Sequence, residues 1–504
     1  MSKLIGFDND KYLNQQTQAI LERVKQFDNK LYLEFGGKLL FDYHAHRVLP
    51  GFDPNVKMRL LQKLKEKAEI ILCIYAGDIE RKKMRADFGI TYDADALKVI
   101  DELAQWGLKL RAVVITRFDG QPAAKIFKNK LERRKVKVYT HQFTKGYPTD
   151  IDRIVSKEGY GANPYIKTKK SLVVVIGPGP GSGKLATCLS QLYHEHKKGI
   201  QAGYAKFETF PIWNLPLKHP VNVAYEAATA DIKDYNMIDP FHLESYQKTA
   251  VNYNRDTEIF PVLKRILKKI TKKTNIYKSP TDMGVNRAGF GIVDDRLVKE
   301  AACQEIIRRF FRYSCEYALG LTDKDTVERS RLLMEELDIK IEQRKVVKAA
   351  RKASKKSDKN KKESPERYVA AIELDNSKII TGKSSSLMHA PSSLILNAVK
   401  VLAGIPDKIH LLSPNTIKSI KRLKKSISKA KTASLDLEET LIALSISASN
   451  NPTAALALEN LKKIKDKEVH LTHIPSSGDE AGLRRLGVNL TSDPNFSTSS
   501  LFFE

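Results

Sequence analysis

The chain has 504 residues, and its 86 Lys and Arg residues outnumber its 59 Asp and Glu residues, for a formal net charge of +27. This length exceeds what one hydrophobic core organises, so we expect several domains. No apolar run approaches the roughly 20 residues that cross a bilayer, the N-terminus has no apolar leader, and the four cysteines are scattered. The sequence therefore predicts a cytoplasmic protein with neither a membrane span nor a disulfide framework.

Strand and helix patterns alternate over the first third of the chain. Near-continuous apolar strands with helices between them are typical of a parallel sheet that is covered on both faces. The pattern predicts a Rossmann-like α/β lobe over residues 1–165. Its expected strands are 69–76, 110–116 and 136–139, and its expected helices are 94–105 and 122–134.

A second lobe is predicted over residues 166–344. The strongest apolar strand of the chain, 171–176, precedes a glycine-rich turn, a helix and a further strand at 202–207. From about residue 221 to residue 338 the pattern is mainly helical. We therefore expect a P-loop-like strand–loop–helix followed by a helical extension.

The remaining residues predict a linker and a smaller domain. Residues 345–365 are polar and rich in lysine, which is typical of a linker. Strand patterns and an apolar helix then predict a C-terminal α/β domain over residues 366–504. The expected fold class is thus α/β, with a mostly parallel sheet, a P-loop-like strand–loop–helix and a smaller C-terminal α/β domain.

A phosphate cradle is predicted where the strand 171–176 leads into a helix through the sequence GPGPGSGKLAT. Glycines let backbone N–H groups point at phosphate oxygens, and the helix N-terminus adds the positive end of its dipole. Lys184 supplies a full charge. The candidate ligands of ATP or another phosphate-containing molecule are Gly179, Gly181, Ser182, Gly183, Lys184 and Thr187.

This turn resembles the Walker A loop, G-x-x-x-x-G-K-[ST], but departs from it at two positions. Pro178 stands where the leading glycine is expected, and Leu185 replaces the Ser or Thr whose hydroxyl holds Mg²⁺. We therefore expect phosphate binding, whereas Mg²⁺-dependent hydrolysis in the usual geometry is disfavoured. Two other interpretations stay open: a structural glycine turn, and a dinucleotide turn for which Glu208 is the one acidic candidate.

Two polar clusters, at 251–258 and 279–286, follow the cradle in the chain. Phosphoryl transfer needs a positive group on the transferring oxygens and a carboxylate for the acceptor hydroxyl or the metal. Arg255 and Asp282 are the candidates for these catalytic roles. An ordinary capped loop with a surface ion pair explains the same residues.

Two weaker motifs complete the search for sites. Asp42-x-His44-x-His46 would place three side chains on one face of a strand, but no second ligand group is recognisable, and no metal site is predicted. The turn that begins at Thr381, before a predicted helix, is a candidate anion site, although such turns also serve as N-caps.

Most of the positive charge lies in three lysine-rich runs, at 264–273, 343–362 and 418–431. In the first and the last of these, apolar residues recur at helical spacing, which predicts lysines on the solvent-facing side of helices. No aromatic residues alternate with these lysines, as the stacking of bases would require. The sequence thus permits nucleic acid as a partner without favouring it.

Four segments resemble those of a known family. They are GPGPGSGKLATCLSQLYHE, AKFETFPIWNLPLKHPVNVAYEAATAD, YKSPTDMGVN and FDYHAHRVLPGFDP. They look like the corresponding segments of a bacterial family of conserved hypothetical cytoplasmic proteins, a domain of unknown function. The resemblance covers the whole chain and implies that the unusual loop is the family's own form. It implies no substrate, activity or catalytic residue.

The predicted function is an enzyme that binds a nucleotide or phosphate, most concretely an ATP-dependent phosphotransferase or ATPase with a divergent Walker A loop. Its substrate would be a small phosphorylated molecule, and a homo-oligomer is compatible with the sequence. One alternative is an enzyme that uses a dinucleotide or phosphosugar without triphosphate hydrolysis. Another is a basic protein that associates with nucleic acid or senses a ligand.

Overall fold

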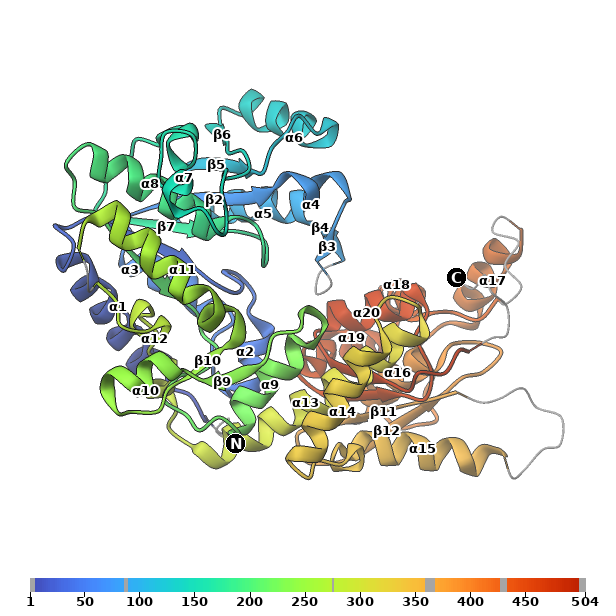
Figure 1. Cartoon of the computed structure of the whole chain (residues 1–504). Helices are drawn as coiled ribbons and strands as arrows, with labels where there is room; N and C mark the ends of the chain where they lie inside the picture. Colours follow the sequence, from blue (N-terminus) through green and yellow to red (C-terminus); the bar gives the residue numbers. More distant parts are fainter. Residues whose placement is uncertain (1–4, 86–88, 274–275, 359–367, 427–432, 498–504) are drawn as a thin grey trace. The chain divides into compact units, whose positions relative to one another are not determined.

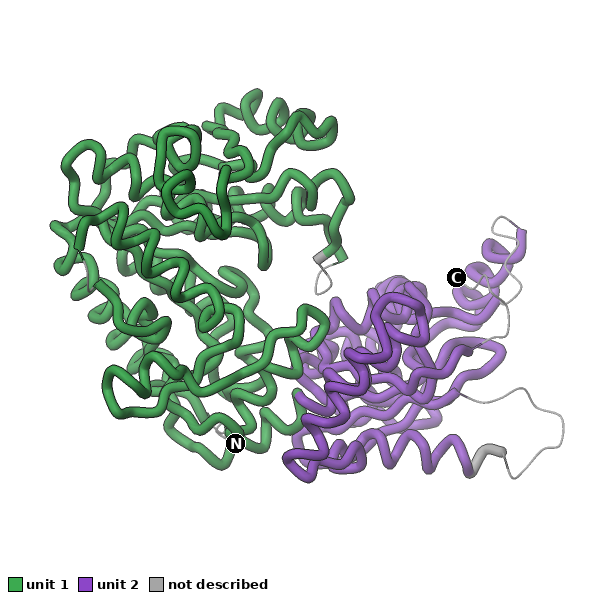
Figure 2. Tube along the Cα trace, in the orientation of Figure 1, with its two compact units in different colours: residues 1–305 green, residues 306–504 purple. Residues whose placement is uncertain are grey.

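The computed structural model describes residues 5–85, 89–273, 276–358, 368–426 and 433–497 (Figure 1). The chain forms two compact units, residues 1–305 and 306–504, which Figure 2 shows in separate colours. This division differs from the predicted one. The lobes expected at 1–165 and 166–344 share a single sheet, because strands from both sides of residue 165 pair with one another.

A six-stranded sheet forms the centre of the first unit, and all of its neighbouring strands are parallel. The predicted α/β class with a mostly parallel sheet is therefore confirmed. The strand order is β6–β5–β2–β7–β1–β8. The strands are β1 (Leu31–Phe35), β2 (Ala68–Tyr75), β5 (Leu110–Thr116), β6 (Val138–Thr140), β7 (Leu172–Ile176) and β8 (Gly203–Phe207).

The path of the chain through this sheet changes direction at β7. From β1 the chain passes to β2, β5 and β6 in turn, and it then returns to β7, which pairs with both β1 and β2. The helix α8 (Lys184–Lys197) leads from β7 across β1 to β8. In doubly wound sheets, ligands bind where the direction reverses, at the carboxyl ends of the strands.

Helices cover both faces of the sheet. On one face, α8 and α11 (Asn254–Thr271) pack on Tyr32, Val173 and Tyr204. On the opposite face, α5 (Tyr92–Gln105) packs on β2 and β5. α11 contains the first lysine-rich run as far as Thr271. Its apolar stripe is buried and its lysines are exposed, as the spacing predicts.

The other elements of the first unit surround this core. The helices are α1 (Asn9–Lys25), α2 (Tyr43–Val48), α3 (Val56–Lys63), α4 (Ala76–Glu80), α6 (Pro122–Arg133), α7 (Ile151–Ile154), α9 (Pro220–Ala228), α10 (Pro240–Tyr246) and α12 (Pro280–Met283). Two short antiparallel pairs are β3 (Met84–Arg85) with β4 (Ile90–Thr91), and β9 (Asn236–Ile238) with β10 (Val251–Tyr253). The helix α13 (Asp295–Ala318) crosses the boundary at residue 305.

The strand imagined for the Asp-x-His-x-His segment is a helix instead. The Asp42 carboxylate accepts a hydrogen bond from the Ala45 amide, and this cap starts α2. The three side chains therefore do not alternate on one face of a strand. Within the described residues, no group of three or more His, Cys, Asp or Glu side chains suits a metal ion.

The second unit contains a four-stranded mixed sheet in the order β12–β11–β13–β14, which confirms the smaller α/β domain. Its strands are β11 (Val369–Glu373), β12 (Ile379–Lys383), β13 (Glu468–Leu471) and β14 (Asn489–Ser492). Only the pair β13–β14 is parallel among the pairs of this sheet. Its helices are α14 (Lys324–Glu336), α15 (Lys345–Asp358), α16 (Ala390–Ala403), α17 (Pro414–Ser426), α18 (Leu437–Ala448), α19 (Pro452–Asn460) and α20 (Ser477–Leu486).

The helix α15 occupies most of the predicted linker. Val346, Val347 and Ala350 are fully buried, and Val346 and Ala350 pack against Val369 and Ala371 of β11. The high lysine content of this segment led to the linker prediction, although one side of the helix is apolar and belongs to the core. Residues 359–365, the rest of the predicted linker, lie outside the described ranges.

Across the portions of the chain with assigned structure, no helix combines the length and the apolar character that a membrane crossing requires.

Candidate functional site

The glycine-rich loop joins the carboxyl end of β7 to the first turn of α8, as the sequence predicts. Gly181 and Gly183 adopt left-handed backbone conformations, with φ of 73° and 87°. The amides of Gly179, Gly181 and Gly183 donate no hydrogen bond to an acceptor within the described residues. Glycine amides next to the N-terminus of a 14-residue helix are the kind of donors from which proteins build anion sites.

Close packing explains why side chains are excluded from three positions of this loop. A Cβ at Gly177 would lie 2.8 Å from the Cys73 carbonyl oxygen, and one at Gly179 would lie 2.5 Å from the Tyr92 hydroxyl. At Gly183 it would lie 2.7 Å from Thr116 Cγ2. The neighbouring residues therefore leave no room for a side chain at these three positions.

Lys184 and Thr187 have different surroundings. The Lys184 ammonium lies 3.4 Å from the Gly179 carbonyl oxygen and 3.5 Å from Ser182 Oγ, so it returns over the loop. Thr187 is buried, and its hydroxyl accepts a hydrogen bond from the Cys73 thiol at 3.4 Å. The structure thus brings Lys184, and not the Thr187 side chain, to the predicted cradle.

A second charged cluster lies at the carboxyl end of β8, one strand beyond β1. The Lys206 ammonium contacts the two Asp256 oxygens at 2.7 and 2.6 Å and a Glu208 oxygen at 3.4 Å. The Tyr253 hydroxyl donates to Glu208 at 3.3 Å. β8 thus contributes Lys206, and the first turn of α11 contributes Asp256.

Burial governs the ionisation of this cluster. It raises the pKa of Glu208 to about 7, with Asp256 and Glu34 adding to the effect and Lys206 and Lys184 opposing it. Burial alone would lower the pKa of Lys206, but the carboxylates around it raise that pKa above its ordinary value. At neutral pH the site therefore holds a charged ammonium and a carboxyl group that can accept or release a proton.

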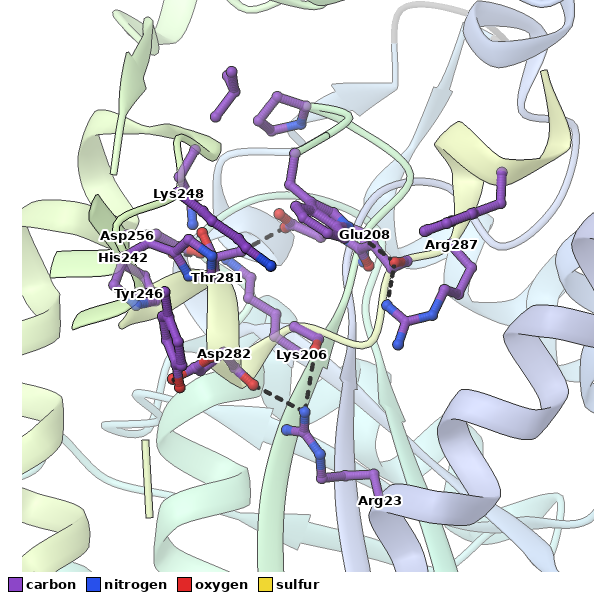
Figure 3. A pocket seen from close by; sticks show the side chains of 18 of the residues that line it. Arg23, Lys206, Glu208, His242, Tyr246, Lys248, Asp256, Thr281, Asp282 and Arg287 are labelled. Carbon is purple, nitrogen blue, oxygen red and sulfur yellow. Dashed lines mark hydrogen bonds and ion pairs between the residues drawn. The ribbon is translucent and has the colours of Figure 1, made fainter. Parts of the chain in front are cut away.

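A pocket of about 580 Å³ opens beside this cluster. Figure 3 shows the side chains of Arg23, Glu208, Asp282 and Arg287 around it. Its lining combines four cations with three carboxylates and several amide and aromatic side chains. The charged residues are Arg23, Lys206, Lys248, Arg287, Glu208, Asp256 and Asp282.

The two predicted catalytic residues, Asp282 and Arg255, lie in different surroundings. Asp282 lines the pocket, and its carboxylate accepts from the Tyr246 hydroxyl at 2.6 Å and the Lys278 amide at 3.0 Å. The Arg255 guanidinium forms an ion pair with the buried Asp234, with Nε 2.5 Å from Oδ1. Arg255 is absent from the residues that line the described pocket.

Sequence reasoning missed Lys206, gave Asp256 no role beyond its place in the polar cluster 251–258, and considered Glu208 only for a dinucleotide. One signal was present in the sequence: Lys206 lies near the end of the predicted strand 202–207, and Glu208 is the first residue after that strand. The partner Asp256 lies 50 positions away from Lys206 in the chain, so local spacing does not reveal the pair.

The candidate anion turn of the second unit has another role. Thr381 and Gly382 lie within β12, and α16 begins only at Ala390, so the turn does not open a helix. A Cβ at Gly382 would lie 2.7 Å from the Ser393 carbonyl carbon. The glycine therefore allows α16 to approach the sheet.

Two family models and several curated proteins match this chain over nearly its whole length. Residues 5–338 match the family model "Domain of unknown function DUF1846, N-terminal", and residues 342–502 match its C-terminal counterpart. A UPF0371 protein of Clostridium botulinum strain ATCC 19397 is 60% identical over 499 residues, 99% of each chain. The UPF0371 protein CLL_A2797 of strain Eklund 17B is 59% identical over the same length and coverage. The chain therefore belongs to the DUF1846 family, whose N-terminal and C-terminal domains it carries in succession.

Proposed function

We propose that this chain is an ATP-dependent phosphotransferase that acts on a small molecule. One observation supports the proposal above all: the glycine loop with Lys184 follows β7, and the Lys206–Glu208–Asp256 cluster lies at the end of β8. Both are at the carboxyl edge of one parallel sheet, with only β1 between those strands. The Lys184 charge also contributes to the pKa of Glu208.

The topology supports the same location. The crossovers that leave β1 and β7 run in opposite directions, and β1 and β7 are neighbours. The loops after these two strands begin with Gly36-Gly37 and with Gly177. A crevice between diverging loops at the carboxyl ends of parallel strands is the usual position of a nucleotide in such sheets.

The proposed reaction assigns a role to each group. The unpaired loop amides and Lys184 hold the phosphates of the nucleotide. The acceptor hydroxyl forms a bond to the terminal phosphorus as the bond from that phosphorus to the bridging oxygen breaks. Glu208 takes the proton of the hydroxyl, and Lys206 balances the charge that collects on the phosphoryl oxygens.

The loop lacks one of the ligands that Mg²⁺ has in the usual Walker A geometry. Leu185 has no oxygen at the position where a Walker A loop supplies a hydroxyl. Any Mg²⁺ would therefore be held mainly by the nucleotide's own phosphates, and it would offset their negative charge. The same observation favours a second candidate function, an enzyme that uses a dinucleotide or phosphosugar without hydrolysing a triphosphate.

Thermal unfolding with and without ligands tests the proposal. ATP, ADP, a dinucleotide and sugar monophosphates are added, with and without Mg²⁺, to wild type, Lys184→Ala and the control Lys130→Ala, whose lysine is exposed on α6. A ligand at about 100 times its Kd stabilises by roughly 3 kcal/mol. We expect ATP to stabilise wild type and Lys130→Ala but not Lys184→Ala. Stabilisation by a dinucleotide in place of ATP would support the second candidate, and an equal ATP effect in all three proteins would refute a site at the loop.

A further inference from the structure

We propose that the 580 Å³ pocket binds a phosphorylated polyol or sugar, with its phosphate held between Arg23 and Arg287. In the proposed transfer reaction this molecule would be the acceptor. Its role as acceptor rests on the proposed function, whereas its binding in the pocket does not. Both guanidiniums are half-buried and reach the pocket, Arg23 from α1 and Arg287 from the segment after α12 (Figure 3).

The two arginines use only part of their hydrogen-bonding capacity inside the protein. Arg23 donates to the carbonyl oxygens of Asp282 at 2.9 Å and Gly284 at 3.4 Å, and to the Tyr277 hydroxyl at 3.3 Å. Arg287 donates to the carbonyl oxygen of Asn286 at 3.1 Å. Over the described ranges, neither guanidinium pairs with a carboxylate.

The positive charges of Arg23 and Arg287 repel each other. Burial, then the Arg23 charge, lower the pKa of Arg287, and Glu22 opposes this only in part. Asp282 lines the same pocket, but within the described residues it forms no ion pair with either guanidinium, so both keep donors that an anion can meet. A phosphate monoester, with up to two negative charges and three terminal oxygens, matches the fixed fork of each side chain.

The rest of the lining fits hydroxyl groups. The side-chain amide of Gln15 and the NH₂ groups of Asn252 and Asn286 line the pocket and donate no hydrogen bond to another described residue. Trp213 and Phe290 add aromatic surface, with ring centroids 6.4 Å apart. Amide donors beside aromatic rings suit a molecule with several hydroxyls and apolar C–H faces.

The pocket also joins this subsite to the proposed chemistry. Lys206, Glu208 and Asp256 line the same cavity as the two arginines. A molecule anchored by its phosphate can therefore present a hydroxyl to the Glu208 carboxylate. The volume lies within the usual range of small-molecule sites, about 300–1,000 Å³.

Isothermal titration of the full-length protein tests this subsite without ATP. The probes are glycerol phosphate and hexose and pentose monophosphates, with the unphosphorylated sugars and inorganic phosphate as matched controls. We expect at least one sugar phosphate to bind wild type better than both its sugar and inorganic phosphate. Arg287→Ala should weaken that binding by about 10- to 100-fold, since it removes charge-assisted hydrogen bonds.

Three further variants separate the outcomes. Arg296→Ala removes an arginine whose side chain is 87% exposed and should leave the affinity unchanged. Arg287→Lys should recover part of it, because the charge remains. Lys184→Ala should bind the sugar phosphate as wild type does, so a failed ATP site and a failed sugar-phosphate site give different results.

The proposal is overturned if no sugar phosphate binds wild type, or if Arg287→Ala binds it as tightly. It is also overturned if the affinity is lost in Lys184→Ala and kept in Arg287→Ala, because the probe would then occupy the loop. Arg287 is the primary target because it supports only one hydrogen bond to its neighbour's carbonyl, whereas Arg23 ties three groups together. Circular dichroism of Arg287→Ala confirms that the variant is folded.

Discussion

The side chain of Glu208 lies directly against Gly36, so closely that a Cβ at position 36 would lie 2.7 Å from Glu208 Cδ. We therefore expect Gly36→Ala to displace the carboxylate from Lys206 and to lower the free energy of unfolding by about 1–3 kcal/mol. Chemical denaturation measures the effect. In a Glu208→Ala background the same Gly36→Ala change should cost much less. Equal costs in the two backgrounds would show that another contact is responsible.

The pH dependence of stability should report Glu208. Its pKa of about 7, against an ordinary 4.5, means that the folded state keeps a proton that the unfolded state has released. Wild type therefore loses stability as pH rises through this window, by roughly 1–3 kcal/mol. Glu208→Gln stays neutral, so it should gain stability relative to wild type from about pH 5 to about pH 8.

Glu258→Gln is the matched control, because this glutamate is exposed on α11. Its stability difference from wild type should stay constant over the same pH range. If the Glu208→Gln difference is flat as well, the carboxyl group titrates normally and the assignment of Glu208 as the proton acceptor loses its support.

Two glycines of the loop should respond differently to alanine. Both have a positive φ, but a Cβ at Gly183 meets Thr116 at 2.7 Å, whereas at Gly181 the nearest atom is 3.9 Å away. Gly181→Ala should cost about 1 kcal/mol for its backbone alone, and Gly183→Ala about 2–4 kcal/mol. Denaturation midpoints check this order. A Gly181→Ala variant as unstable as Gly183→Ala would contradict the packing described for the loop.

Arg255 should matter for stability. Its partner Asp234 has a side chain that is 1% exposed, so Arg255→Ala leaves a buried carboxylate without its cation. We expect a loss of about 1–3 kcal/mol, moderated because the Arg255 side chain is 46% exposed. Adding Asp234→Asn should restore much of it, as a double-mutant cycle measures. A loss of ligand turnover at unchanged stability would instead revive the predicted catalytic role.

The helix α15 should behave as part of the core. Val347 is fully buried, and we expect Val347→Ala to destabilise the second unit by roughly 1–3 kcal/mol. Faster amide hydrogen exchange in β11 would locate the effect. Lys352→Ala, at an exposed position of the same helix, should change exchange little. If Val347→Ala changes neither the stability nor the hydrogen exchange, the linker interpretation of this segment would be supported instead.

The long apolar strands and the strand–loop–helix could be predicted because each depends on neighbouring residues. β1 was missed, since its sequence LYLEF is short and contains Glu34. The structure satisfies that carboxylate with the Tyr204 hydroxyl at 2.8 Å, a partner 170 positions away. Likewise, the lysine content of 345–365 masked the apolar face of α15.

The candidate site was predictable only at its glycine loop. Glycine spacing and an adjacent lysine are local signals, and the structure puts both at the carboxyl end of β7. The pairing of Lys206 with Asp256, and the approach of Arg23 to Arg287, join segments that meet only in the folded chain. Arg255 was a candidate on local sequence alone, but in the folded chain its guanidinium forms an ion pair with Asp234.

The register of β1 and β8 ties the chemistry of the site to strand length. Glu34 is paired with Lys206, and these two share a face with Tyr32 and Tyr204 because residues two apart in a strand point the same way. One extra residue within β8, ahead of Lys206, would turn that lysine to the opposite face. Insertions should therefore be tolerated in the surrounding loops and rejected inside these two strands, which a deep insertion scan would reveal as two short intolerant windows.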